Sequence, residues 1–441
     1  MGRILIAGTH SGCGKTTVTC ALLAAIKKRG LPLSAFKCGP DYIDPMFHRK
    51  VLGIPSHNLD SFFSTPDQLR EMLSADSEKT ALLEGTMGYY DGAGPDGRYS
   101  TYEVACATNT PVVLVIDVKG MYASAGAILE GFLNYKPANQ IQGVIFNNTS
   151  AALYHGLRSI AEKAGVKPLG FLPKEPDASL ESRRLGLVSA NEITEIEQKL
   201  KLLGRLAEQY IDIGALLALS AVPPILPLFK KSVLHTSKPV RIAIARDNAF
   251  CFLYEENLNL LSSIGCEPVF FSPLADRALP EEIGGLYLCG GYPELHLLAL
   301  SKNTSLLTSI RRAVQSGLPT VAECGGFLYL HRTLDGYPMA GAIDVDAFRT
   351  DRLVRFGYIT LQAKHDNLLC AAGETIRAHE FHYYDSSDCG GGFTAQKPLT
   401  GQSWPCIHTT QTLYAGFPHL YFNSNPAFAE NFVKRAMKYA P

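Results

Sequence analysis

The chain of 441 residues contains 46% hydrophobic and 19% charged residues, a balance that excludes a disordered or fibrous protein and favours two globular domains. Lysine plus arginine and aspartate plus glutamate number 41 each, so net charge predicts binding neither to nucleic acid nor to an anionic membrane. The eleven cysteines show no regular spacing, and an apolar strand follows Met1 directly, so we expect a cytoplasmic protein with reduced thiols. No long uninterrupted apolar run is present in the sequence, which predicts that the protein has no transmembrane helix.

The first half of the sequence alternates short aliphatic runs with helical stretches. The predicted strands are residues 3–7, 33–36, 80–83, 111–117 and 141–146, and the first predicted helix is residues 18–29. Because β-branched and aliphatic runs separated by helices are typical of crossover connections, this half predicts a parallel sheet covered by helices.

A glycine-rich loop, GTHSGCGKTT at residues 8–17, lies between the first strand and the first helix. In this context backbone N–H groups and the helix N-terminus bind phosphate, Lys15 reaches the β- and γ-phosphates, and Thr16 ligates Mg²⁺. Thr9 stands where the motif usually has its first glycine. The predicted ATP-binding residues are Thr9, Ser11, Gly12, Gly14, Lys15, Thr16 and Thr17, with Asn147 at a strand end predicted to contact the adenine edge.

Position 10 of this loop separates two classes of nucleotide-binding protein. Partitioning and cell-division ATPases with a similar loop carry a lysine there, whereas this chain has His10. The loop instead resembles that of dethiobiotin synthetase, an enzyme that activates a carboxyl-type group as a phosphate adduct. The sequence therefore favours an enzyme over an ATPase switch.

Acidic residues and a second lysine follow the predicted strands. Lys37, Asp41 and Asp44 come after the strand at 33–36, and Glu84 ends the strand at 80–83. Since open parallel sheets bind ligands at the carboxyl ends of their strands, these groups predict a site for phosphoryl transfer to a carboxylate, with Lys37 as a catalytic cation and Thr16, Asp44 and Glu84 as metal ligands. Two further acids are Asp91, which follows Glu84 in the same loop, and Asp117, which is either a second metal ligand or a strand cap.

A proline-punctuated, partly basic stretch at 223–238 predicts a connector between domain 1–222 and domain 239–441. After it the strand and helix pattern restarts. Strands are predicted at residues 240–245, 268–271, 285–288 and 319–322, and a helix at residues 258–265. The second domain is therefore predicted to be another α/β domain.

The second domain carries a strand, a sharp turn and a helix with Cys324 at the apex. The glycines after it permit a strained turn, and the Gly325 N–H can face an oxyanion, as in a nucleophile elbow. A second strand ends in Gly290 and Gly291, which would supply another oxyanion N–H. The residue types alone leave the base open among His331, His365, His379, His382, His408 and His419, and the spacing of His379 and His382 does not predict a metal site.

Six sequence blocks together resemble the cobyrinic acid a,c-diamide synthases of corrinoid biosynthesis. They are residues 11–17, 36–45, 58–62, 84–92, 290–294 and 322–326. The resemblance implies an α/β protein with an N-terminal P-loop domain similar to dethiobiotin synthetase and a C-terminal domain similar to class I glutamine amidotransferases. It implies ATP- and glutamine-dependent amidation of the a- and c-acetate side chains of a corrin ring through a carboxyl phosphate, with ATP and Mg²⁺ required.

The same resemblance assigns roles to single residues. Cys324 would be the glutaminase nucleophile and His419 its base, because the family's histidine lies in the stretch that here reads YAGFPHLYF. Residues implied to bind substrate are Asp41, Tyr42, Asp44, Asp91, Gly290, Gly291 and Gly325. Tyr421 departs from the family, since a full triad has a glutamate there and the relatives usually have a histidine; residues 181–187 also depart from the usual pattern.

Three alternatives stay open at this point. The same chemistry could act on nickel sirohydrochlorin, on the route to coenzyme F430, because the motifs overlap. A cobyric acid synthase fits less well, because such chains usually run longer and lack the block at 39–44. A P-loop switch with a degenerate glutaminase-like module is disfavoured by the intact elbow and by His10. The order of a and c amidation, the ammonia path and a homodimer are not determined by the sequence.

Overall fold

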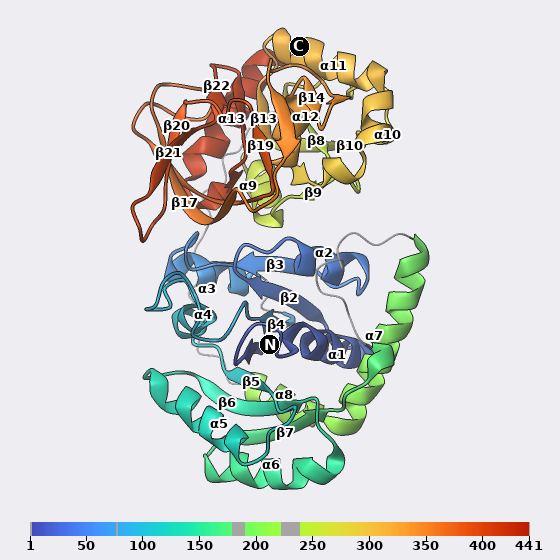
Figure 1. Ribbon diagram of the computed structural model, residues 1–441, viewed down its shortest axis with the longest axis vertical. Coiled ribbons are helices and arrows are strands. Elements are labelled where there is room, and N and C mark those ends of the chain that lie inside the picture. The colour runs from blue at the N-terminus through green and yellow to red at the C-terminus, as the bar shows by residue number, and fades with distance from the viewer. Residues whose placement is uncertain (1, 76–77, 179–189, 222–238, 441) are drawn as a thin grey trace. The chain divides into compact units, whose positions relative to one another are not determined.

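The computed structural model describes residues 2–75, 78–178, 190–221 and 239–440. The chain divides into two compact units, residues 1–230 and 231–441, and each unit has a sheet system of its own (Figure 1). The predicted connector at 223–238 and the loop at 181–187 lie outside the described residues. The predicted domain limits at 222 and 239 therefore stay predictions.

The first unit is built on a seven-stranded parallel sheet with strand order β3-β2-β4-β1-β5-β6-β7. Its strands are β1 (Arg3–Gly8), β2 (Leu33–Cys38), β3 (Ser56–Leu59), β4 (Thr80–Glu84), β5 (Val112–Asp117), β6 (Ile141–Asn147) and β7 (Lys167–Leu172). Every neighbouring pair is parallel, as predicted. The edge strands β3 and β7 are additional, because their polar or proline-containing sequences lack the continuous apolar run used for prediction.

Helices cover both faces of this sheet (Figure 1). They are α1 (Lys15–Lys28), α2 (Ile43–Lys50), α3 (Pro66–Ser74), α4 (Thr101–Thr108), α5 (Ser124–Tyr135), α6 (Ala151–Lys163), α7 (Ala190–Tyr210) and α8 (Ile213–Ser220). On β1, Ile4 and Ile6 belong to the core with α1, α7 and α8, whereas Leu5 and Ala7 belong to the core with α3 to α6. Since successive side chains of a strand point to opposite faces, a strand buried on both faces is apolar throughout.

The second unit contains a six-stranded sheet with order β10-β8-β11-β13-β23-β22, parallel except for the pair of β22 and β23. Its strands are β8 (Val240–Ala245), β10 (Cys266–Phe271), β11 (Gly285–Leu288), β13 (Thr320–Glu323), β22 (His408–Thr409) and β23 (Leu413–Gly416), and the helices of the unit are α9 (Glu255–Ser263), α10 (Leu297–Lys302), α11 (Thr304–Gln315), α12 (Gly325–Leu330) and α13 (Pro426–Tyr439). The predicted α/β class is confirmed.

Three smaller sheets complete this unit and were not predicted. Their orders are β12-β9, β15-β14-β16-β19 and β21-β20-β17-β18-β24. The strands are β9 (Phe250–Phe252), β12 (Gly290–Gly291), β14 (Thr333–Leu334), β15 (Tyr337–Pro338), β16 (Asp346–Arg349), β17 (Arg355–Ala363), β18 (Thr375–His382), β19 (Tyr384–Ser386), β20 (Phe393–Gln396), β21 (Ser403–Cys406) and β24 (His419–Leu420). Strands such as β18 alternate exposed and buried residues and contain many polar ones, so their apolar signal is weak.

The chain near the C-terminus passes from one sheet of the second unit to another. β23 pairs with β13, and two residues later β24 pairs with β18, where His419 lies opposite His379. Asn257 of α9 holds this passage, because its Nδ2 donates to the Leu420 carbonyl over 2.8 Å and its Oδ1 accepts from the Phe422 N–H over 2.9 Å. The passage brings His419 to the end of the parallel sheet at which β13 stops.

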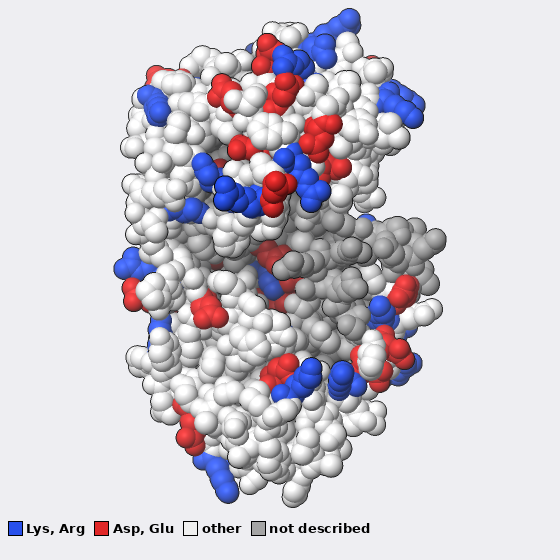
Figure 2. Space-filling view, viewed as in Figure 1, with Lys and Arg blue, Asp and Glu red and all other residues white. Residues whose placement is uncertain are grey.

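Charged side chains of both signs are interspersed on the face of each unit shown in Figure 2, in line with their equal numbers in the sequence. No helix within the described ranges combines the length and the apolar character that a bilayer span requires. Any site for an anionic ligand must therefore be built locally, at the strand ends of the two sheets.

Candidate active sites

The glycine-rich loop forms a phosphate cradle between β1 and α1. Gly12 and Gly14 have φ values of 86° and 96°, and α1 begins directly after Gly14. A Cβ at Gly14 would lie 2.1 Å from Asn147 Nδ2, which donates to the Cys13 carbonyl over 3.0 Å. Glycine is required here both by the left-handed backbone and by the close approach of β6. The strand, loop and helix order predicted from the sequence is confirmed.

The predicted nucleotide-binding residues line this cradle with different exposures. Ser11 is exposed, Thr9 is partly buried with its Oγ1 2.9 Å from His10 Nδ1, and Lys15 is buried with its Nζ donating to the His10 carbonyl over 3.2 Å. Burial lowers the pKa of Lys15, and the nearby charge of Lys37 lowers it further. Phosphate oxygens would supply the negative charge that this buried ammonium lacks.

Asn147 is positioned by the P-loop itself. Its side-chain amide at the end of β6 donates a hydrogen bond to the Cys13 carbonyl, and this contact links the P-loop to β6. The predicted contact of Asn147 with adenine stays a prediction, and the structure adds this supporting role.

A buried charge cluster lies where β2 and β4 end side by side. Lys37 and Glu84 are opposite each other in the sheet register, and Lys37 Nζ lies 2.8 Å from Glu84 Oε1 and 2.5 Å from Asp44 Oδ2. Thr16 Oγ1 donates to the same Glu84 oxygen over 2.7 Å. The residues predicted to serve phosphoryl transfer are thus brought together with the P-loop helix.

The electrostatics of this cluster follow from its burial. Burial raises the pKa of Glu84 to about 7 although Lys37 opposes the shift. Burial also acts to raise the pKa of Asp44, but the charge and hydrogen bond of Lys37 hold it below its ordinary value. The pKa of Lys37 lies well above its ordinary value, because the attraction of Asp44 and Glu84 outweighs the effect of burial. The lysine therefore stays charged and keeps Asp44 ionised.

Sequence reasoning missed His48, which completes this cluster. His48 on α2 is fully buried, and its Nε2 lies 3.8 Å from Glu84 Oε2. Burial lowers the pKa of His48 to about 4, so the ring is neutral at physiological pH. Asp44 and His48 are four residues apart on α2, so their side chains lie on the same face of this short helix.

The donor set fits a divalent cation shared with phosphate oxygens. Glu84 Oε2 is buried and has no hydrogen-bond partner. The other oxygen of the same carboxyl group, Oε1, accepts a hydrogen bond from Thr16 Oγ1. Within the described ranges no group of three or more His, Cys, Asp and Glu side chains could hold a metal ion by itself. Mg²⁺ usually keeps several water ligands and binds to the phosphates of a nucleotide, so it requires few protein ligands. A hydroxyl group and a carboxylate of this kind would be sufficient.

The remaining predicted acids of this unit have separate places. Asp41, partly buried, accepts from the Ile43 and Asp44 N–H groups over 2.8 and 3.1 Å and so caps the start of α2 beside the buried Tyr42. Burial raises the pKa of Asp41 to about 6. Asp91 is exposed and its Oδ2 accepts from the Gly88 N–H over 3.0 Å, next to the Thr9 carbonyl.

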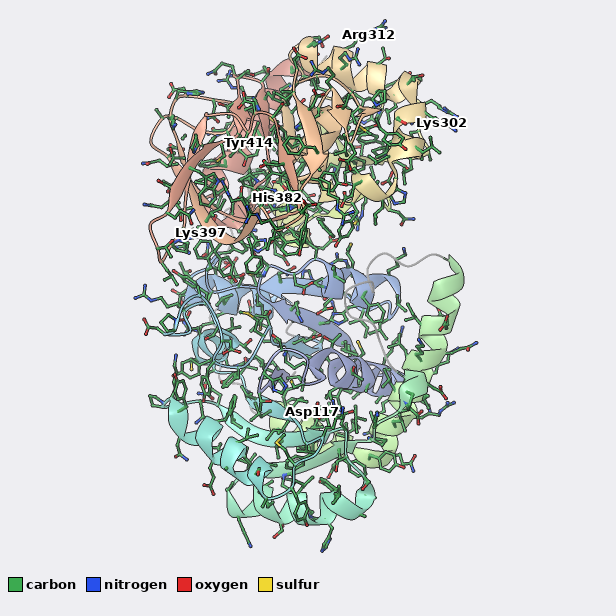
Figure 3. All side chains as sticks on the ribbon, in the orientation of Figure 1. Asp117, Lys302, Arg312, His382, Lys397 and Tyr414 are labelled. Atoms are coloured by element: carbon green, nitrogen blue, oxygen red, sulfur yellow. The ribbon has the colours of Figure 1, made fainter. Side chains whose placement is uncertain are left out.

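Asp117, labelled in Figure 3, makes the contact of a strand cap. Its Oδ1 accepts from the Lys119 N–H over 3.0 Å at the end of β5. The alternative role of Asp117 as a second metal ligand stays a prediction.

Cys324 occupies the predicted elbow between β13 and α12. Its backbone has φ 46° and ψ −105°, a strained conformation that turns the thiol out of the strand direction. The Cys324 N–H donates to the Gly416 carbonyl over 2.8 Å, which fixes the elbow to β23. Burial raises the pKa of the Cys324 thiol, and the nearby carboxyl group of Glu294 raises it further. The resting sulfur is therefore a thiol and needs a base.

The paired glycines of β12 and α12 lie against each other. A Cβ at Gly325 would be 2.9 Å from the Gly291 nitrogen, and a Cβ at Gly291 would be 2.0 Å from the Ala249 carbonyl. A Cβ at Gly290 would be 2.3 Å from His419 Cε1. The elbow, the second glycine loop and the ring of His419 therefore meet at one place, as the sequence predicted for the two loops.

His419 is nearly fully buried in this site, and sequence reasoning missed a carboxyl group beside it. The Nδ1 of His419 lies 3.9 Å from Oε2 of Glu323, the residue directly before the nucleophile. Tyr421, which stands where a full triad has a glutamate, packs edge-on against Tyr254 with ring centroids 5.2 Å apart. No local motif marks Glu323, because the two partners are far apart in the sequence.

The other candidate bases make contacts of their own. His382, labelled in Figure 3, donates from Nδ1 to the Tyr384 carbonyl and stacks on Phe417 at 3.9 Å. His331 lies 2.9 Å from Ser386 Oγ, and burial lowers its pKa to about 4. His365 forms a hydrogen bond with the Thr409 hydroxyl, and His408 forms one with the Asp388 carbonyl. His379 lies opposite His419 in the sheet, so of these rings it is the one paired in register with the predicted base.

A P-loop unit with a buried charge cluster, followed by a unit with a cysteine elbow, is typical of the class of ATP-dependent glutamine amidotransferases. Two family models match the chain: the CobQ/CobB/MinD/ParA nucleotide binding domain over residues 4–187, and the CobB/CobQ-like glutamine amidotransferase domain over residues 241–426. The first supports nucleotide binding by the unit that carries Lys15, and the second matches the unit that carries Cys324.

Similar curated proteins cover nearly the whole chain. Cobyrinate a,c-diamide synthases from Clostridium acetobutylicum and Thermoplasma volcanium are 37% and 36% identical to it, over 98% and 99% of this chain and 100% and 98% of their own lengths. One from Listeria monocytogenes serotype 4b is 40% identical over 87% of both chains. The chain therefore belongs to the cobyrinate a,c-diamide synthase family, and it is an amide-forming, glutamine-hydrolysing ligase.

Proposed function

We propose that this protein amidates the a- and c-side-chain carboxylates of cobyrinic acid, using ATP and the ammonia of glutamine. The observation that carries the proposal is the presence in one chain of two sets of candidate catalytic groups, the cluster of Lys15, Lys37 and Glu84 and the elbow of Cys324 with His419. The near full-length similarity to cobyrinate a,c-diamide synthases supports the choice of substrate.

The synthetase site would activate the carboxylate as a carboxyl phosphate. A carboxylate oxygen attacks the γ-phosphorus and ADP leaves; the nitrogen of ammonia then attacks the acyl carbon and phosphate leaves. In this step Lys15 would bind the β- and γ-phosphates, and Thr16, Asp44 and Glu84 would hold Mg²⁺. Bound Mg²⁺ would neutralise phosphate charge during transfer. Lys37, which stays charged, would offset the crowded anions around the reacting carboxylate.

The remaining predicted residues of this site would hold the nucleotide and the substrate. Thr9, Ser11, Gly12, Gly14 and Thr17 form or flank the phosphate cradle. Asp91, exposed beside the P-loop, and Asp41 with Tyr42, at the start of α2, are proposed to orient the substrate.

The glutaminase site would release ammonia by thioester chemistry. The Cys324 proton passes to His419, the sulfur attacks the glutamine amide carbon, and ammonia leaves with the proton from His419. Water then hydrolyses the thioester to glutamate. The N–H groups of Gly291 and Gly325 would donate hydrogen bonds to the developing oxyanion, with Gly290 beside the imidazole.

A product assay tests the proposal directly. The protein is incubated with ATP, Mg²⁺ and glutamine, in parallel with cobyrinic acid and with nickel sirohydrochlorin, and the products are weighed by mass spectrometry. Two successive mass changes of one carboxyl-to-amide conversion each are expected with cobyrinic acid. Amidation of nickel sirohydrochlorin alone would contradict the choice of ring, and ATP hydrolysis without amidation would favour an ATPase switch.

Two variants separate the half-reactions. Cys324→Ala is expected to lose glutamine-dependent amidation and keep the ammonium-dependent reaction, whereas Lys15→Ala is expected to lose both because no carboxyl phosphate forms. Product is quantified with glutamine and, separately, over a series of ammonium concentrations. Glutamine-dependent amidation by Cys324→Ala would contradict the nucleophile, and an intact ammonium reaction in Lys15→Ala would contradict the P-loop assignment.

A further inference from the structure

Glu323, the last residue of β13, lies beside the ring of His419. Both side chains are 3% exposed, and the shortest distance between them runs from Glu323 Oε2 to His419 Nδ1, 3.9 Å. Because Nδ1 faces the carboxyl group, the other ring nitrogen, Nε2, is left to exchange a proton with the thiol. This is the division of the two nitrogens that a catalytic imidazole requires.

The backbone fixes the carboxyl group in this orientation. Glu323 is paired with Gly416 in the parallel sheet, and its Oε1 accepts from the Leu420 N–H over 3.1 Å. One oxygen is thereby tied to the residue that follows His419, and the other is directed to the ring. Asn257 holds the Leu420 carbonyl, so both polar groups of that residue are engaged.

We propose that Glu323 is the positioning residue of the glutaminase site, which holds the tautomer of His419 and stabilises its imidazolium form while Cys324 reacts. The inference rests on the proposed role of Cys324 and His419. In the reaction the thiol proton passes to Nε2, while the Nδ1 proton stays between the ring and Oε2. The 3.9 Å separation closes to a hydrogen bond when the ring becomes charged, as catalytic contacts in substrate-free sites commonly do.

The surroundings of His419 make such a carboxylate necessary. Titratable groups around this pair include Glu323 from β13, Tyr287 from β11, which acts on the Glu323 carboxyl group, and His379 and His382 from β18. Burial lowers the pKa of His419 to about 3, and the two other imidazoles lower it further, whereas burial raises the pKa of Glu323 to about 8. An imidazolium would find no counter-charge at His379 or His382. Ionised Glu323 supplies it.

The isosteric change Glu323→Gln tests the role, because its amide oxygen can still accept from the Leu420 N–H. We expect the kcat for glutamine hydrolysis to fall about 10²- to 10⁴-fold with the KM changed little, since the transition state and not substrate binding is affected. Glu323→Asp, which keeps the charge, should restore a large part of the loss. The ratio of glutamine- to ammonium-dependent amidation is the readout, and Glu267→Gln, an exposed change on β10, is the matched control.

The pH profile distinguishes a positioning role from a structural one. Glutamine hydrolysis by the unmodified protein should rise as pH passes about 8, where Glu323 loses its proton, and this limb should be absent in Glu323→Gln and present in Glu323→Asp. A Glu323→Gln protein within twofold of the unmodified kcat, or with the same alkaline limb, would overturn the inference. If the unmodified protein amidates with ammonium but not with glutamine, the proposed function of the second unit fails, and the inference fails with it.

Discussion

At the residue scale, the structure assigns to single glycines a role that their sequence motif does not show. Gly290 leaves space for the imidazole of His419, since a methyl group there would lie 2.3 Å from Cε1. That distance is far below a carbon–carbon contact of about 3.5 to 4 Å, so the ring would have to move.

Gly290→Ala is therefore expected to displace His419 and to lower the kcat of glutamine hydrolysis about 10²-fold or more, in line with the loss from misplacing a catalytic group. Ammonium-dependent amidation should persist. Gly391→Ala is the control, because a Cβ at Gly391 meets no atom within 4 Å. Steady-state rates with both nitrogen sources check the prediction, and unchanged glutamine hydrolysis in Gly290→Ala would contradict the placement of the base.

The same scale shows what the sequence could and could not predict about the sites. Lys15 and Cys324 were predictable because a strand, a glycine turn and a helix place each of them through local chain geometry. Glu323 and His48 were not, because each meets its partner through the pairing or packing of elements far apart in the chain. Contacts of this kind depend on sheet order, which a single sequence does not specify.

At the element scale, α9 determines where β24 lies. Asn257 is fully buried and makes two hydrogen bonds to the backbone on either side of Tyr421. Its loss would leave a buried carbonyl and a buried N–H without partners, each costing about 1–3 kcal/mol.

Asn257→Ala is expected to lower the unfolding free energy of the second unit by about 2–5 kcal/mol and to reduce glutamine hydrolysis through the displacement of His419. Asn431→Ala on α13 is the control, since Asn431 donates one hydrogen bond, to the Leu369 carbonyl. Urea unfolding together with glutaminase rates checks both variants. Equal effects of the two changes on hydrolysis would show that α9 has no special part in holding the base.

The elements themselves were predictable to different extents. The parallel strands were found because burial on both faces makes them apolar throughout, as in β5, VVLVID. The strands of the smaller sheets were missed because one face meets water, as in β18, TIRAHEFH. The edge strand β3, SHNL, is too short and polar to be recognised without its partner β2.

At the scale of the whole molecule, buried titratable groups predict an optimum in stability. In the second unit, burial lowers the pKa of four histidines to about 3 or 4 and raises the pKa of three glutamates to about 7 or 8. They are His331, His379, His382 and His419, and Glu294, Glu323 and Glu380.

The signs of the two sets are opposite. Below pH 6.5 the unfolded histidines bind protons that the folded ones do not, so stability rises with pH between about 4 and 6.5. The folded glutamates keep protons that the unfolded ones have lost, so their contribution falls as pH rises from about 4.5 to 8. The melting temperature of the second unit should therefore be highest near about pH 6. Calorimetry from pH 4.5 to 9 checks this, and a melting temperature that rises steadily to pH 8 would contradict it.

The raised pKa of Cys324 has a consequence for the lifetime of the protein in the cell. Peroxides and alkylating agents react with the sulfur anion and only slowly with the protonated form. Because Cys324 is buried and protonated at rest, the free protein carries a nucleophile that is protected from chemical damage between turnovers. Its vulnerability is confined to the moment when a glutamine-shaped molecule enters, and an electrophilic glutamine analogue would inactivate it far faster than a general thiol reagent.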